Sequence, residues 1–380
     1  MQHDPGAPKV ALNLTGGGAR AAYQVGVLEA ICELVPQNSE NPFPIVCGTS
    51  AGAVNAAVLA AHAMDFGAGV QRLANVWENL YSDQVYRSDS KSVRATGARW
   101  LKALMPGGIR TQRPVSLLDN APLAEFLGRT IPFEQIGECI AGGALDAVGI
   151  TASGYTSGLP VTFFEGAPTI EPWVRARRLG VSARIGVAHL MASSAIPFIF
   201  PAVQIGQEFF GDGAMRQVAP MTPALHLGAH RILVISAGRM TRMAPRQDNG
   251  DPSLAQIAGH AINSIFLDNV EADLERVELI NKIIGLVPDE KLVQSGIGLR
   301  RVEVVLISPS SDIEGIAVRH ADDLPRSVRV LFGGSERMKQ SAAILLSYLL
   351  FQSAYCRELI ALGYKDAMAR SEDLTRLLVE

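Results

Sequence analysis

The sequence predicts an α/β fold: a three-layer α/β/α sandwich with a mainly parallel central sheet, followed by a helical C-terminal region. The first observation behind this prediction is a βαβ unit at the start of the chain. The second is a series of short apolar runs that alternate with helical segments to about Ser308. Units of this kind are right-handed, and they produce parallel sheets with helices on both faces.

The βαβ unit begins with the apolar run KVALNL at residues 9–14, which is short enough for a buried strand. The segment AAYQVGVLEAICELV at 21–35 has apolar residues at helical spacing, and FPIVCG at 43–48 is the next strand. An alanine-rich helix follows from Ala51. Further strands are predicted at 146–153, 160–166, 231–237 and 301–308.

The composition of the chain changes twice outside these elements. Within about 81–130 it becomes rich in Ser, Arg, Gly and Pro, which favours an insertion of short helices and loops over an extra domain. From Ser335 onward, apolar residues recur at helical spacing. We therefore expect one domain over residues 1–310, which contains the insertion, and a helical extension over 311–380 that packs on the same domain.

Charge and composition exclude several classes of protein. The formal net charge is -3, and the basic residues are scattered apart from Arg175, Arg177 and Arg178, so nucleic acid is not an expected partner. Hydrophobic residues make up 48% of the chain. The longest apolar stretch, residues 190–206, is interrupted by two prolines and is too short to span a bilayer as a helix. Membrane contact is therefore expected to be peripheral and transient.

The cysteines and the N-terminus favour a cytoplasmic location. The four cysteines form no C-x-x-C pair, which is typical of reduced, buried thiols without disulfides and without a zinc site. The first ten residues contain neither a basic region nor an apolar core, so no secretory signal is predicted. No pattern in the sequence indicates the oligomeric state.

The first motif with chemical meaning is TGGGAR at residues 15–20, between the opening strand and its helix. Consecutive glycines let the backbone approach a ligand closely and direct N–H groups at an anion, near a helix N-terminus that favours negative charge. Arg20 adds a positive charge beside them. Gly16, Gly17 and Gly18 are therefore candidates for an oxyanion hole, in which backbone donors stabilise negative charge on a carbonyl oxygen.

A dinucleotide-binding loop is the alternative interpretation of these glycines. Gly16, Gly18 and Ala21 fit a G-x-G-x-x-[GA] pattern, which needs an acidic residue at the end of the second strand, about 20 positions on. Glu40 is at nearly that distance, but it lies in the turn before the second strand. This position cannot reach a ribose from the strand's end, so we favour the oxyanion hole.

The second motif is GTSAG at residues 48–52, between the second strand and the alanine-rich helix. The pattern alone is weak in a chain with 36 glycines, and a crowded turn without chemical function would also explain it. Its position is typical of a nucleophile elbow, because Gly48 and Gly52 leave room for the sharp turn that exposes Ser50. The N–H group of Ala51 can join the glycine loop in holding an oxyanion.

The third motif is the DGA in FFGDGAMR, where Asp212 stands between two glycines. An Asx turn would explain Asp212 structurally. However, activation of Ser50 requires a base, and no histidine lies in a comparable loop motif. Asp212 is therefore left as a candidate for this base, and Gly213 would allow its close approach to the elbow. The seven histidines are His3, His62, His189, His226, His230, His260 and His320.

The three motifs, GGGAR, GTSAG and DGA in this order, resemble the patatin-like phospholipase family. The resemblance runs from about Val10 to Ser236 and includes AAYQVGVLEA after the glycine loop and ASSAIPFIFPAV before the aspartate. It implies a Ser–Asp dyad of Ser50 and Asp212, with an oxyanion loop of Gly16, Gly17 and Gly18 and support from Arg20. One position departs from the family pattern, since Ala21 replaces the glycine that usually follows the basic residue.

The function implied by this resemblance is a serine acyl hydrolase that acts on phospholipids, lysophospholipids or other fatty acyl esters. Neither a metal nor a cofactor is expected, because the nucleophile and the donors are all protein groups. An acyltransferase or thioesterase with the same dyad is an alternative, and so is a non-catalytic lipid-binding regulator. The bulky apolar residues of 195–203 also suit an acyl chain, so this segment is expected near the site.

Overall fold

The computed structural model describes residues 8–36, 41–87, 116–239, 268–288, 300–326 and 342–379, together with short pieces at 257, 259–260, 263–264, 291–292 and 328–329. Most of the predicted insertion, residues 88–115, lies outside the described residues. So do His3, Glu40 and the start of the predicted C-terminal helical region.

Five parallel strands form the centre of the molecule, in the order β10-β9-β1-β2-β3. All five coincide with segments that the sequence predicts as strands, and β2 and β3 each extend one residue further, so the α/β prediction is confirmed. Their residues are mostly apolar and buried, as expected when helices cover both faces of a sheet. The strands are β1 (Val10–Leu14), β2 (Ile45–Thr49), β3 (Ala147–Gly154), β9 (Arg231–Ile235) and β10 (Glu303–Ile307).

The other half of the sheet is mixed, with both parallel and antiparallel pairs. The predicted strand β4 (Pro160–Gly166) runs antiparallel to β3, while β5 (Trp173–Arg175) and β6 (Arg178–Ser182) extend the edge beyond it. A hairpin of β7 (Val203–Ile205) and β8 (Glu208–Asp212) pairs with the end of β3. The sequence analysis did not predict β5 to β8, because they are short and their apolar residues alternate only weakly.

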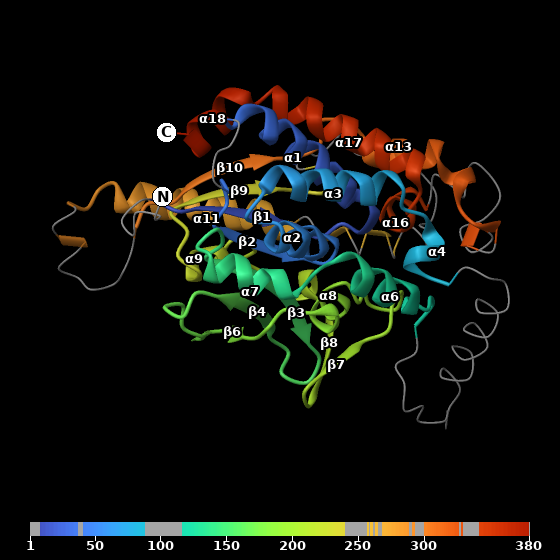
Figure 1. Cartoon of the computed structure of the whole chain (residues 1–380), viewed down its shortest axis with the longest axis horizontal. Helices are drawn as coiled ribbons and strands as arrows, with labels where there is room; N and C mark the ends of the chain where they lie inside the picture. The colour runs from blue at the N-terminus through green and yellow to red at the C-terminus, as the bar shows by residue number, and fades with distance from the viewer. Residues whose placement is uncertain are drawn as a thin grey trace.

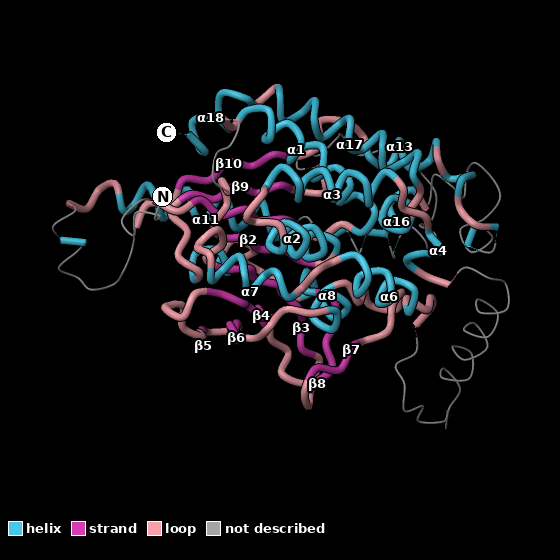
Figure 2. Tube along the Cα trace, in the orientation of Figure 1, coloured by secondary structure: helices cyan, strands magenta, loops and turns pink. Residues whose placement is uncertain are grey.

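The helices form two layers around the sheet, which Figures 1 and 2 show running through the middle of the molecule. Side chains alternate between the faces of a strand. Leu12 and Leu14 of β1 therefore pack in one core with the helices α1, α2, α3 and α17, whereas Ala11 packs in a second core with α9 and α11. The helices are α1 (Ala22–Leu34), α2 (Ala51–Ala61), α3 (Phe66–Glu78), α9 (Thr222–His226), α11 (Asp268–Ile284) and α17 (Ser353–Met368).

Shorter helices surround the open end of the sheet. Two of them, α6 and α8, lie side by side beyond the ends of β3 and β8. The C-terminal residues add α13 and α16 close to the glycine loop, and α18 beside β10. These helices are α4 (Ser82–Val85), α6 (Ala121–Thr130), α7 (Glu134–Ala141), α8 (Val187–Ser193), α13 (Ile313–Arg319), α16 (Ala343–Leu349) and α18 (Ser371–Val379).

Helices α1 and α17 lie against each other along their length, although more than 300 residues separate them in the sequence. A Cβ atom added at Gly26 would overlap the carbonyl oxygen of Ile360, and one added at Gly363 would overlap that of Tyr23. Each helix therefore supplies a glycine where the backbone of the other approaches. This contact fixes the C-terminal helices on the layer that carries α1.

All four cysteines are free thiols, and three of them are buried. Burial raises the pKa of Cys47 and of Cys356 to about 12, so both remain protonated. None of the helices within the described ranges is long and apolar enough to cross a bilayer.

We predict that Gly363→Ala lowers the free energy of unfolding by at least about 2 kcal/mol, because the added methyl group forces α1 and α17 apart. Urea unfolding followed by circular dichroism would measure this change. Gly137→Ala on α7 is the matched control, since its Cβ would come no closer than 3.5 Å to Glu165. The control should leave stability unchanged or raise it slightly. Equal effects of the two substitutions would contradict the close packing.

Candidate active site

Ser50 occupies a sharp turn between β2 and α2. Its backbone has φ 56° and ψ -127°, a conformation that residues other than glycine rarely adopt. A Cβ atom at Gly48 would overlap the carbonyl oxygen of Gly52, and a Cβ atom at Gly52 would overlap that of Leu14. The turn therefore requires both glycines that the sequence analysis singled out.

Hydrogen bonds from a neighbouring helix hold this strained turn in place. The Ser50 N–H donates to Ser193 Oγ at 2.8 Å, and the Ser193 hydroxyl donates to the Thr151 carbonyl on β3 at 2.6 Å. Ser50 is almost completely buried, with 1% of its surface exposed. Hydrogen bonds from the end of α8 to the turn and to the central sheet thus hold the strained conformation of Ser50.

Asp212 reaches the same place from β8. It pairs with Ala152 of β3 in the antiparallel register, and its N–H donates to the Ala195 carbonyl at 2.9 Å. The sequence analysis treats this aspartate motif as a loop. The structure corrects this expectation, since Asp212 ends an antiparallel hairpin strand. A Cβ atom at Gly213 would overlap the Thr151 carbonyl oxygen, so this glycine permits the close approach.

The Asp212 carboxyl group is fully buried and incompletely paired. Its Oδ1 accepts a hydrogen bond from the Ala214 N–H at 3.0 Å, whereas Oδ2 has no hydrogen-bond partner within the described residues. Burial raises the pKa of Asp212 to about 7, although the nearby Ser50 hydroxyl and the Ala214 N–H both lower it. No regular hydrogen bond joins the Ser50 and Asp212 side chains among the described residues, and catalytic hydrogen bonds often form fully only when substrate binds.

The glycine loop lies beside Ser50, but its three glycines occupy different surroundings. Gly18 has φ 54° and lines the same cavity as Ser50 and Ala51. Gly16 instead lines a separate, small cavity, and Gly17 packs against Ala237. No acceptor in the described part of the chain takes the N–H of Gly18 or Ala51. These two N–H groups therefore suit an oxyanion better than the N–H of Gly16 does.

The side chain of Arg20 does not lie along the glycine loop, so its positive charge is not placed beside the glycines. Its side chain is buried and points to the C-terminal helices, where it donates to Glu314 at 2.8 Å and to Ser347 at 2.8 Å. The guanidinium group also lies 4.1 Å from the centre of the Tyr348 ring. Because Glu314 neutralises it, Arg20 supports the loop mechanically and supplies little field to an oxyanion.

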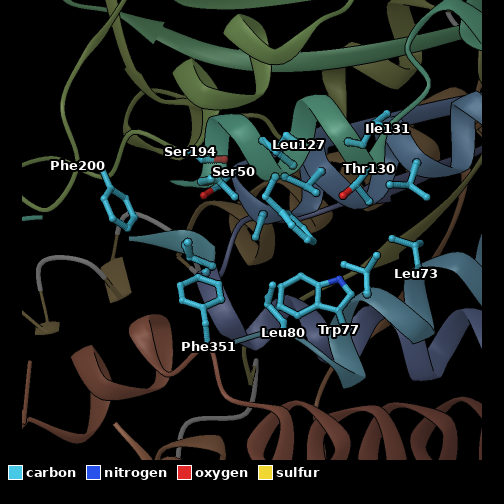
Figure 3. Close-up of a pocket in the computed structure, with 18 of the residues that line it drawn as sticks. Ser50, Leu73, Trp77, Leu80, Leu127, Thr130, Ile131, Ser194, Phe200 and Phe351 are labelled. Atoms are coloured by element: carbon cyan, nitrogen blue, oxygen red, sulfur yellow. The ribbon is translucent and has the colours of Figure 1, made fainter. Parts of the chain in front are cut away.

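A cavity with about 60 Å³ of space for the centres of water-sized molecules opens beside Ser50 and is lined almost entirely by apolar side chains. Figure 3 shows Ser50 and Ser194 at one end of this cavity, and Leu73, Thr130 and Ile131 at the other. Trp77 of α3 and Leu127 of α6 form opposite walls between these ends. The arrangement is suited to a long apolar group whose polar end lies at Ser50.

The apolar segment 195–203 contributes to the wall near Ser50. Ile196 and Phe200 line the cavity, as the sequence analysis expected of this segment. Phe198 is different, because it is 69% exposed and has a positive φ of 66°. Within this short segment, Ile196 and Phe200 thus face the cavity, whereas Phe198 faces the surface.

Sequence reasoning missed several residues that form this site. Ser193 and Thr151 position the Ser50 turn, and the residues of α3 and α6 line the cavity. The segment ASSAIP before the aspartate was the one available signal for Ser193. The cavity walls had none, since apolar residues at helical spacing look the same whether they face a core or a cavity.

The histidines that the structure describes are not bonded to the side chains of Ser50 and Asp212. In the described ranges, no histidine has a hydrogen bond to Ser50 or Asp212. The pKa of His189 is lowered by burial, and its ring packs on Phe163. No group of three or more His, Cys, Asp or Glu side chains within the described residues is arranged to hold a metal ion.

The chain is similar to one protein family and to several solved structures. A family model described as "Patatin-like phospholipase" matches residues 12–225. The structure of VipD from Legionella pneumophila aligns with a TM-score of 0.38 and 10% identity, over 96% of this chain and 67% of VipD. The type III effector protein ExoU aligns with a TM-score of 0.34 and 16% identity, over 98% of this chain and 54% of ExoU. No curated protein matches the chain in sequence.

The raised pKa of Asp212 predicts a dependence of stability on pH. Folding favours the protonated carboxyl group, so its contribution is present below about pH 4 and is lost as the pH rises through about 7. Asp212→Asn removes this penalty. We expect the variant to gain stability over the wild type between pH 5 and 8, by an amount of the order of 4 kcal/mol at most.

Urea unfolding at several pH values would measure this difference. The matched control is Asp83→Asn, which changes an exposed carboxyl group on α4. The free energy of unfolding of each variant is compared with that of the wild type at pH 5 and at pH 8. If Asp212→Asn shows the same difference as Asp83→Asn at both pH values, the buried Asp212 carboxyl group does not destabilise the folded protein.

Proposed function

The chain belongs to the patatin-like phospholipase family, and we propose from this premise that it hydrolyses fatty acyl esters of lipids with Ser50 as nucleophile and Asp212 as base. The observation that supports this proposal most strongly is that the Asp212 side chain interacts with Ser50, which in turn lies at one end of an apolar cavity. Ser50 arrives on a strained turn and Asp212 on a hairpin strand, so two distant segments converge on one reaction centre.

The proposed reaction has two steps. In the first, Ser50 Oγ attacks the ester carbonyl carbon while Asp212 accepts the hydroxyl proton, and the N–H groups of Gly18 and Ala51 stabilise the oxyanion. The intermediate collapses, and Asp212 returns the proton to the leaving alcohol oxygen. In the second step, water gives a proton to Asp212 and attacks the acyl-enzyme carbonyl carbon. The bond to Ser50 Oγ then breaks, Asp212 returns the proton to Ser50 Oγ, and the fatty acid leaves.

The burial of Asp212 explains how a carboxylate can serve as this base. An aspartate with its ordinary pKa is too weakly basic to take a proton from a serine hydroxyl efficiently. Burial raises the pKa of Asp212 to about 7, which brings the group closer to the best value for proton transfer at neutral pH. The neighbouring Gly213 and the antiparallel pairing with β3 fix the carboxyl group close to Ser50.

The cavity supports a fatty acyl group as the substrate's acyl portion. Burying an acyl chain against its apolar walls stabilises the complex, while the polar portion of a lipid remains outside near Ser50. We further propose that the protein contacts lipid surfaces transiently, because its substrates reside there.

We predict that Ser50→Ala reduces ester hydrolysis by at least about 1,000-fold with little loss of stability, because it removes the nucleophile from a site where alanine fits. Hydrolysis of p-nitrophenyl and phospholipid esters would be measured, together with covalent labelling by a fluorophosphonate. Labelling of the variant equal to that of the wild type would contradict the assignment of Ser50. Labelling of the wild type without hydrolysis of any ester would favour a transferase.

For Asp212→Asn we predict a loss in kcat of at least about 100-fold, because the amide cannot accept the proton of Ser50. In the wild type, kcat/KM should rise with pH through about 7, since the active form of Asp212 is the carboxylate. The matched controls are His189→Ala, His226→Ala and His230→Ala, each of which should keep most activity. A histidine variant as inactive as Asp212→Asn would indicate a conventional triad.

The far end of the cavity is predicted to limit the length of the acyl chain. Leu73→Phe places a larger group at the end opposite Ser50, so the preferred acyl chain should become shorter. Rates over a series of p-nitrophenyl esters from short to long acyl chains would measure the shift. Phe198→Ala changes an exposed aromatic residue and serves as the control, with an unchanged chain-length profile expected. The same profile in all three proteins would argue against an acyl chain in this cavity.

A further inference from the structure

A second serine hydroxyl lies in the cavity beside Ser50. Ser194 follows the last residue of α8 and is 7% exposed, and it lines the same end of the cavity as Ser50 (Figure 3). Its Oγ is buried and has no hydrogen-bond partner in the described part of the chain. A buried hydroxyl without a partner destabilises the folded protein, because it has lost its hydrogen bonds to water and gained none in return. Such a group therefore calls for a functional explanation.

The residues on either side of Ser194 are bonded to the two proposed catalytic residues. Ser193 Oγ accepts the N–H of Ser50 at 2.8 Å, and the Ala195 carbonyl accepts the N–H of Asp212 at 2.9 Å. The contacts of Ser193 and Ala195 therefore hold the backbone of Ser194 between the proposed nucleophile and the proposed base. The Ser194 hydroxyl takes part in neither contact, so it can bond to a substrate.

The oxyanion and the leaving oxygen must lie on different sides of the tetrahedral carbon. The candidate oxyanion donors come from the loop after β1 and from the start of α2. The leaving oxygen must be within reach of Asp212, because this residue returns the proton to it. Ser194 comes from the segment bonded to Asp212 and from neither segment that supplies the candidate oxyanion donors, so the leaving oxygen is the charge that its hydroxyl is assigned to stabilise.

We infer that Ser194 is a further catalytic residue, whose hydroxyl donates a hydrogen bond to the leaving alcohol oxygen of the ester. This inference rests on the proposed function of Ser50 and Asp212. Negative charge develops on the leaving oxygen as its bond to carbon breaks, and a hydrogen bond in a dry site stabilises that charge. The benefit increases with the basicity of the alcohol, so it is large for alkyl and glyceryl esters and small for nitrophenyl esters.

The test compares Ser194→Ala with the wild type on esters that share one acyl chain and differ in the acidity of the alcohol. We expect kcat/KM of the variant to fall about 10- to 100-fold for alkyl and glyceryl esters and less than about 3-fold for p-nitrophenyl esters, the order expected for loss of one donor. The logarithm of the rate should therefore depend more steeply on the pKa of the alcohol in Ser194→Ala. Ser194→Thr keeps the hydroxyl and should recover most of the loss.

Ser116→Ala is the control for loss of a buried serine hydroxyl elsewhere. The Ser116 hydroxyl donates to the Leu118 carbonyl at 3.0 Å, so it is already paired. This variant should show the same dependence on the alcohol as the wild type. Fluorophosphonate labelling of Ser50 in Ser194→Ala should also remain near the wild-type rate, because fluoride is a good leaving group.

The outcomes separate the two proposals. A wild type that hydrolyses the esters while Ser194→Ala loses the same factor on every ester would overturn the role of Ser194 and leave the dyad intact. Unchanged rates in Ser194→Ala would overturn it as well. A wild type that neither labels nor hydrolyses any ester would overturn the proposed function itself, and this inference with it.

Discussion

The geometry around Ser50 depends on backbone segments that approach each other more closely than any side chain permits. Added Cβ atoms at Gly48, Gly52 and Gly213 would each overlap a backbone carbonyl oxygen of a neighbouring segment. This constraint draws the ends of β1, β2, β3 and β8 together at one edge of the sheet. The polar groups of several segments consequently meet within one small, dry volume.

The C-terminal helices take part in the same constraint. A Cβ atom at Gly18 would overlap the Tyr348 carbonyl oxygen, so α16 lies directly behind the glycine loop. Arg20 crosses this contact and joins the loop to Glu314 and Ser347. A buried guanidinium group is stable only when it is paired, so the loop and these helices depend on each other. The described residues after β10 therefore support the glycine loop, and Phe351 among them also lines the cavity beside Ser50.

Burial of Asp212 affects stability and chemistry in opposite ways. A carboxyl group without full pairing destabilises the folded state when it is ionised, and the same burial makes it a stronger base. Asp212 is shielded from water by its own burial, with its backbone paired to β3 and bonded to Ala195, while the apolar cavity lies beside the neighbouring Ser50.

The sequence by itself determined the parallel core of the fold, the nucleophile turn and the glycines that it requires. These features are local: a buried strand is a short apolar run, and G-x-S-x-G between a strand and a helix has few other uses. Only the tertiary structure decided that Asp212 arrives on an antiparallel strand, that Arg20 points to the C-terminal helices, and that Ser194 shares the cavity. The direction of a side chain and the partner of a short strand depend on segments far away in the sequence. Their energies come from contacts between these segments, so no local pattern contains them.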